Sequence, residues 1–165
     1  MDTIKAITRA AALTAVALTI FMIEARIPAP IPIPGIKLGL SNIVTLFALY
    51  ALGPKTALAI LVCRILSGGF ITGQPMAILY SLSGGLAAFA FAALARFPKE
   101  RIWILSALCG VIHNLGQLCA AALIIGEPGV FYYLPILTVS GIVTGVFTGI
   151  AAQSALAKLT ANGLF

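Results

Sequence analysis

Residues 102–125 read IWILSALCGVIHNLGQLCAAALII and contain no charged side chain. A helix of about 20 such residues crosses the hydrocarbon core of a membrane. The whole chain has this character, because 61% of its 165 residues are hydrophobic and 8% are charged, against about 25% charged in soluble domains. So few charges do not cover a water-soluble globule, which argues against a soluble monomer, a disordered chain or a secreted disulfide scaffold. We expect one all-α integral membrane domain over residues 1–165.

Helix breakers and gaps between charged residues divide the chain into six expected spans. These cover about residues 5–25, 38–52, 54–67, 76–96, 102–125 and 133–157. Gly68-Gly69 is expected to end the third span, which is then too short to cross without tilt or bilayer thinning. A five-span alternative treats it as re-entrant. The first span also has the basic start of a secretion signal, but no cleavage site follows before Glu24, so we expect a retained helix.

The distribution of Lys and Arg predicts the orientation of the chain. With a cytoplasmic N-terminus, seven basic residues fall on the inner side and three on the outer side. The inner residues are Lys5, Arg9, Lys55, Arg96, Lys99, Arg101 and Lys158. The sequence therefore predicts that both termini are cytoplasmic, which favours six crossings over five.

The three outer basic residues, Arg26, Lys37 and Arg64, are candidates for ligand binding. Ionisable groups within a span are costly and usually face a cavity or the bundle interior. We expect these residues and Glu24 to lie at a similar depth in the membrane, on its outer side. The alternative is that the cations snorkel to the membrane surface and that Glu24 pairs locally with Arg26.

Three polar residues, His113, Asn114 and Gln117, lie near the middle of the span at 102–125. His113 and Gln117 share a helix face, and Asn114 lies about 100° round from it. Hydrogen bonds between helices would explain any one of them. The presence of three such residues within a stretch of five favours a polar cavity. Other side chains expected to point into it are Asn42, Thr45 and Gln74.

An outer cavity with a positive rim favours an anionic ligand, because Arg binds carboxylate and phosphate groups through paired hydrogen bonds. Residues 27–35 read IPAPIPIPG, and their alternate prolines exclude a helix. This loop is expected to cap the outer mouth, although a plain extended linker remains the alternative.

Small residues at four-residue spacing let helices approach closely. The last span contains such a series at Gly141, Gly145 and Gly149, which we expect to pack inside the protein. The first span contains two successive pairs, and a terminal helix is the better candidate for contact with another subunit. The residues of this expected partner interface are Ala6, Ala10, Ala11 and Ala15.

The sequence lacks the residues that several functions require. Asp2 is the one aspartate, whereas prenyl diphosphate chemistry by the usual route needs aspartates to hold magnesium. Pro54 precedes Lys55 where a phosphate-binding loop requires glycine. The three cysteines have no paired spacing, and there is one histidine. We therefore expect no catalytic role, no metal, no cofactor and no nucleic-acid partner.

A resemblance to a known family rests mainly on the run GIKLGLSN at residues 35–42, which IVTL follows at 43–46. The chain resembles small bacterial membrane proteins of the Gx transporter family, also labelled heptaprenyl diphosphate synthase component I. That family is similar in turn to the substrate-binding S components of energy-coupling factor transporters. The resemblance implies six helices in the bacterial cytoplasmic membrane and a ligand near the outer face.

The resemblance also implies partners and possible ligands. S components dock on a transmembrane coupling subunit through small residues of the first helix, which would fall on Ala11 and Ala15, with Ala6 and Ala10 as the other register. Two cytoplasmic ATPases drive them. The synthase label points to an isoprenoid or quinone-related ligand, and some relatives are associated with flavins.

The leading hypothesis is a membrane solute-binding subunit that takes an anionic or amphipathic precursor. Arg26, Lys37 and Arg64 would contact negative groups, and Asn42, His113, Asn114 and Gln117 would add hydrogen bonds. The alternatives are a non-catalytic accessory subunit of an isoprenoid or quinone biosynthesis enzyme and a self-sufficient secondary transporter.

Overall fold

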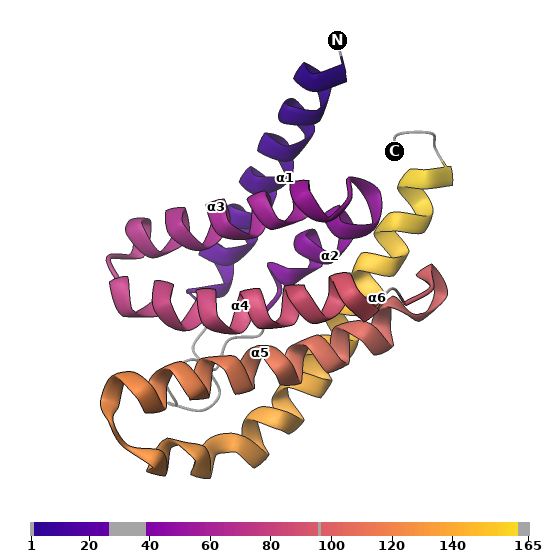
Figure 1. Cartoon of the computed structure of the whole chain (residues 1–165). Coiled ribbons are helices and arrows are strands. Elements are labelled where there is room, and N and C mark those ends of the chain that lie inside the picture. The colour runs from indigo at the N-terminus through magenta and orange to yellow at the C-terminus, as the bar shows by residue number, and fades with distance from the viewer. Residues whose placement is uncertain (1, 27–38, 96, 162–165) are drawn as a thin grey trace.

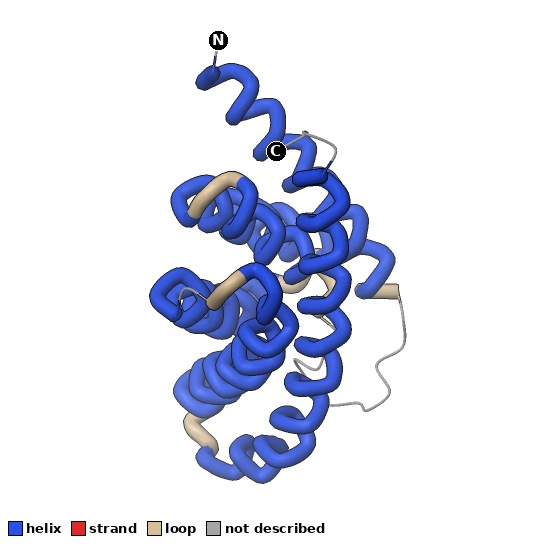
Figure 2. Tube along the Cα trace, turned by 90° about the vertical axis from the view of Figure 1, so that its right-hand side faces the viewer, coloured by secondary structure: helices blue, strands red, loops and turns tan. Residues whose placement is uncertain are grey.

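A computed structural model describes residues 2–26, 39–95 and 97–161, and among these it contains helices and connecting turns but no strand (Figures 1 and 2). Five of the helices are long and apolar enough to cross a membrane. The all-α membrane class is therefore supported, while the number of crossings and the side of each terminus stay predictions. The helices are α1 (Asp2–Glu24), α2 (Asn42–Ala51), α3 (Pro54–Thr72), α4 (Pro75–Ala95), η1 (Lys99–Arg101), α5 (Ile102–Ile125), η2 (Pro128–Tyr133) and α6 (Leu134–Ala161).

The third helix is longer than expected and continues past residue 67 to Thr72. Gly68 and Gly69 do not end it, because both are buried against other helices. A Cβ on Gly68 would lie 2.8 Å from the ring of Phe21 in α1, and one on Gly69 would clash with Ile78 in α4. These glycines permit close packing inside α3. The helix ends instead at Gly73, whose left-handed φ of +65° is typical of a helix C-terminus.

The short helix is α2, which has 10 residues. At 1.5 Å per residue it is about 15 Å long, half the thickness of the hydrocarbon core. Its residues from Val44 to Ala48 are nevertheless all buried. α2 packs against α1, α3 and α6, so it forms the centre of the bundle rather than a lipid-facing span.

Both ends of the described chain lie at the same end of the bundle, together with the α2–α3 and α4–α5 connections (Figure 1). The α3–α4 and α5–α6 connections lie at the opposite end. Lys55 at the start of α3, Lys99 and Arg101 in η1, and Lys158 near the end of α6 therefore share one end. This arrangement matches the sorting of charges that the sequence predicts.

Glycines bring α5 and α6 together along most of their length. Gly110 and Gly141 face each other so closely that neither has space for a Cβ. Further along, a Cβ on Gly145 would lie 2.5 Å from the carbonyl oxygen of Ser106. The predicted internal packing of the glycine series in α6 is thus confirmed.

The other side of α5 contacts α4 in the same way. A Cβ on Gly116 would lie 2.9 Å from the Cα of Gly84, and the hydroxyl of Ser83 donates a hydrogen bond of 2.8 Å to the carbonyl of Gly116. Because helix contacts in a membrane depend on close packing and hydrogen bonds, α4, α5 and α6 form a tightly joined group.

Gly145→Ala should destabilise the protein by about 1–3 kcal/mol, since the added methyl group would push against the Ser106 carbonyl. Gly129→Ala is the matched control, because a Cβ at Gly129 would have no atom within 4 Å. Thermal unfolding in detergent measures both. Equal melting temperatures for the two variants would contradict the close contact between α5 and α6.

Candidate functional site

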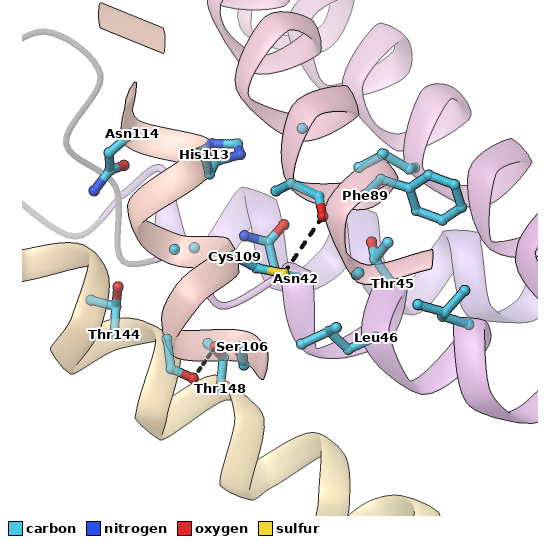
Figure 3. A pocket seen from close by; sticks show the side chains of 18 residues that line it. Asn42, Thr45, Leu46, Phe89, Ser106, Cys109, His113, Asn114, Thr144 and Thr148 are labelled. Carbon is cyan, nitrogen blue, oxygen red and sulfur yellow. Dashed lines mark hydrogen bonds between the residues drawn. The ribbon is translucent and has the colours of Figure 1, made fainter. Parts of the chain in front are cut away.

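A cavity lies between α2, α4, α5 and α6, and α3 contributes one described lining residue, Leu61 (Figure 3). The volume of the cavity is about 60 Å³. Its polar lining consists of Asn42, Thr45, Ser106, His113, Asn114, Thr144 and Thr148, and its larger apolar side chains are Leu46, Leu49, Leu61 and Phe89.

The first turn of α2 contributes two polar side chains to the cavity. Asn42 and Thr45 are three residues apart and so share one face of the helix. Thr45 is 8% exposed, and its hydroxyl has no hydrogen-bond partner among the described residues. A buried hydroxyl without a partner is unusual and calls for an explanation.

The polar residues in the middle of α5 divide between two neighbouring helices. His113 and Gln117 both face Gly84 of α4, as their four-residue spacing predicts. Asn114 faces α6, and its amide nitrogen donates a hydrogen bond of 2.7 Å to the carbonyl of Leu137. His113 and Asn114 line the cavity, whereas Gln117 is buried outside its lining.

Ser106 and Thr148 join α5 to α6 on the cavity wall. Their hydroxyl oxygens are 3.0 Å apart, and Thr148 also donates to the carbonyl of Gly145 at 3.1 Å. Thr144 lines the same wall and donates to the carbonyl of Ser140 at 2.8 Å. These hydroxyl groups are thus satisfied within the protein, in contrast to Thr45.

Arg64 is 5% exposed and lies beside the start of α2. Its Nη1 donates to the hydroxyl of Ser41 at 2.6 Å, and its Nη2 donates to Oδ1 of Asn42 at 3.4 Å. The guanidinium therefore contacts the cavity indirectly, through Asn42. Its Nε has no partner among the described residues. Arg64 also lines a small cleft together with Phe21 and Ser81.

Glu24 completes this polar group from the end of α1. It is 5% exposed, and its carboxylate accepts a hydrogen bond from the backbone N–H of Gly39. Gly39 has a φ of +71°, which glycine adopts without strain. Glu24 also interacts electrostatically with Arg64. The two oppositely charged groups thus belong to one buried cluster, defined by Glu24, Gly39, Ser41, Asn42 and Arg64, which we call the α1–α3 polar cluster.

The structure brings three of the seven predicted ligand residues to the cavity: Asn42, His113 and Asn114. Arg64 and Gln117 are buried next to it without lining it. Arg26 is exposed, as is Gln74 in the turn after α3. Lys37 and the proline-rich loop lie outside the described residues.

Ser106, Phe89 and Thr148 were not predicted as lining residues. The spacing of α5 contained a signal for Ser106, because it lies seven residues, or about two helical turns, before His113 and therefore on a similar face. No comparable signal marks Phe89, since an aromatic residue in an apolar span is equally suited to face lipid. Its position depends on how α4 packs.

The expected partner interface on α1 is largely uncovered. Ala6, Ala11 and Ala15 are exposed, whereas Ala10 packs against the core group that contains Ala17 and Val44. Of the two registers that the sequence offers, only the pair Ala11 and Ala15 is fully exposed.

Comparison with known protein families finds a match to a family model described as heptaprenyl diphosphate synthase component I, over residues 13–155. The chain belongs to this family. No curated protein and no solved structure matches it. The match covers every residue that lines the cavity, so the cavity lies within the region that the family model describes.

Membership in the component I family has two consequences. The name denotes one component of a heptaprenyl diphosphate synthase system and implies a partner component. The apolar helices add that this component is associated with a membrane. The family name and the helices together indicate a membrane-associated component of that system.

Arg64→Gln should destabilise the protein by about 1–3 kcal/mol, because it removes the buried hydrogen bonds from the guanidinium to Ser41 and Asn42. Arg26→Gln removes a charge of the same sign at an exposed site and should change stability by no more than about 0.5 kcal/mol. Chemical unfolding in detergent measures both variants. Similar losses would show that the α1–α3 polar cluster does not hold the helices together.

Proposed function

We propose that this chain is a membrane-embedded substrate-binding subunit of the S-component type. The observation that carries the proposal is the cavity between α2, α4, α5 and α6, where polar side chains gather inside an otherwise apolar bundle. Such side chains are costly within a membrane and generally mark a ligand or transport pathway. A subunit with a purely structural role has no need of a cavity with this lining.

The ligand is a small amphipathic or anionic precursor of cofactor or isoprenoid type. Leu46, Leu49 and Phe89 offer an apolar wall, and Asn42, His113 and Asn114 offer hydrogen bonds. Arg64 adds positive charge behind Asn42. Arg26, Lys37 and Gln117, which the sequence also predicts as ligand residues, stay part of this proposal as further contacts.

Transport by such a subunit requires partners: a transmembrane coupling subunit and cytoplasmic ATPases. The proposed contact surface is the exposed face of α1 at Ala11 and Ala15. Small side chains there permit a second helix to approach closely. α1 is also the first helix of the chain and leaves several large apolar side chains uncovered, among them Ile4 and Ile7.

The second candidate function is a non-catalytic membrane subunit that anchors an isoprenoid or quinone biosynthesis enzyme, and the family description favours it. It predicts co-purification with a soluble prenyl synthase and no ligand in the cavity. A third candidate, a self-sufficient secondary transporter, predicts uptake by the chain alone in liposomes.

Native mass spectrometry of gently purified protein should show a retained small molecule. His113→Ala should lower the retained fraction about tenfold, which corresponds to about 1.4 kcal/mol of lost binding energy. Cys119→Ala is the control, because Cys119 is exposed on the same helix. A wild-type protein that carries no small molecule but binds a synthase would favour the anchoring role instead.

The double variant Ala11→Leu and Ala15→Leu should abolish co-purification of a coupling subunit, because larger side chains prevent close helix contact. Ala90→Leu places the same side chain on the exposed face of α4 and should leave co-purification unchanged. If neither change affects recovery of the partner, α1 is not the contact surface.

A further inference from the structure

The Thr45 hydroxyl differs from the other helical threonine hydroxyls that line or flank the cavity. Thr138 and Thr144 donate to the carbonyl four residues earlier at 2.8 Å, which satisfies them within their own helix. Thr45 Oγ1 makes no such bond and has no partner among the described residues, although the residue is 8% exposed. A buried polar group in a cavity wall without a protein partner indicates that the occupant of the cavity supplies one.

Two amide side chains in the same lining are held in fixed orientations. A guanidinium can only donate, so the bond from Arg64 Nη2 at 3.4 Å places the oxygen of Asn42 toward Arg64. A carbonyl can only accept, so the bond to Leu137 places the nitrogen of Asn114 toward α6. Asn42 is left with a donor for the cavity, and Asn114 is left with an acceptor.

The close-up view agrees with this assignment. The nitrogen of Asn42 lies on the side of α5, and the oxygen of Asn114 is turned toward His113 and the pocket (Figure 3). Across the cavity, α2 therefore presents donors and α5 presents an acceptor. A ligand group that satisfies both must itself carry an acceptor and a donor.

The described lining contains no Lys, Arg, Asp or Glu. Among the described residues, Arg64 is the cation beside the lining, and it is already bonded to Ser41 and Asn42. Burying an ionised group without a direct partner is unfavourable. Among the described residues, the buried end of the cavity therefore favours an uncharged head over a carboxylate or phosphate.

We propose that the cavity recognises an uncharged head that carries both an acceptor and a donor, as a carboxamide or a lactam does. Its carbonyl faces Asn42 Nδ2 and the Thr45 hydroxyl, and its N–H faces Asn114 Oδ1. The attached ring or chain packs on Phe89 and Leu46. This inference rests on the proposed ligand-binding function and selects the amphipathic over the anionic class for the buried part of the ligand.

Benzamide and benzoate test the charge of the head, because they have the same ring and nearly the same size. Binding to the protein in nanodiscs at pH 7.5 is measured by ligand-observed NMR, and empty nanodiscs correct for partition into lipid. Benzamide should bind at least tenfold more tightly. Equal or tighter binding of benzoate, or no binding of either probe above empty nanodiscs, would overturn the proposal.

Thr45→Val tests the contact itself. It should weaken benzamide binding roughly threefold to tenfold, the effect of one hydrogen bond. It should also leave the melting temperature of the ligand-free protein equal or higher, because it removes a buried hydroxyl that has no partner. Thr45→Ser should retain binding, and Thr138→Val, whose hydroxyl is bonded to the Leu134 carbonyl and lies outside the cavity lining, should leave it unchanged. Unchanged benzamide binding in Thr45→Val would rule out the hydroxyl as a contact.

Failure here is distinguishable from failure of the proposed function. If native mass spectrometry shows a retained molecule that depends on His113 while neither probe binds, the cavity takes a ligand of another class. If no molecule is retained and neither probe binds, both proposals are wrong.

Discussion

The buried guanidinium of Arg64 determines how the first half of the protein is arranged. An ion in an apolar interior requires partners that are close and correctly oriented. Ser41 and Asn42 provide them at the start of α2, and Glu24 brings the end of α1 into the same group through Gly39. Three helices are thereby fixed relative to one another by one polar cluster, and α2 is held at the centre although it is too short to span a membrane by itself.

The second half is held by a different kind of contact. α4, α5 and α6 approach so closely that their glycines leave no space for side chains. In lipid, where apolar surface gains little from being buried against other apolar surface, such close packing provides much of the attraction between helices. The cavity lies where the two halves meet, because the side chains of α2 do not fill the space in front of α5 and α6. The close-packed half provides a rigid wall, and the polar cluster orients Asn42 on the opposite wall.

Particular residues show how far sequence reasoning reaches. The spacing of His113 and Gln117 correctly predicted that they share a face, and the glycine series of α6 correctly predicted close packing. Gly68 and Gly69 were misinterpreted as a helix end, because the sequence does not reveal that Phe21 and Ile78 occupy the space beside them. Arg64 was grouped with Arg26 as an outer cation. The structure separates them, with Arg64 in a hydrogen-bonded cluster and Arg26 exposed.

The sequence by itself determined that the protein is a bundle of apolar helices in a membrane, because hydropathy and charge spacing depend only on composition and order along the chain. It also determined which residues are too polar for lipid. Only the tertiary structure decided which of them meet. The amide of Asn42 points its nitrogen into the cavity because Arg64, on another helix, binds its oxygen. The Thr45 hydroxyl has no partner because no polar group of another described helix packs against it. Both facts arise from contacts between segments distant in sequence, which local spacing does not encode.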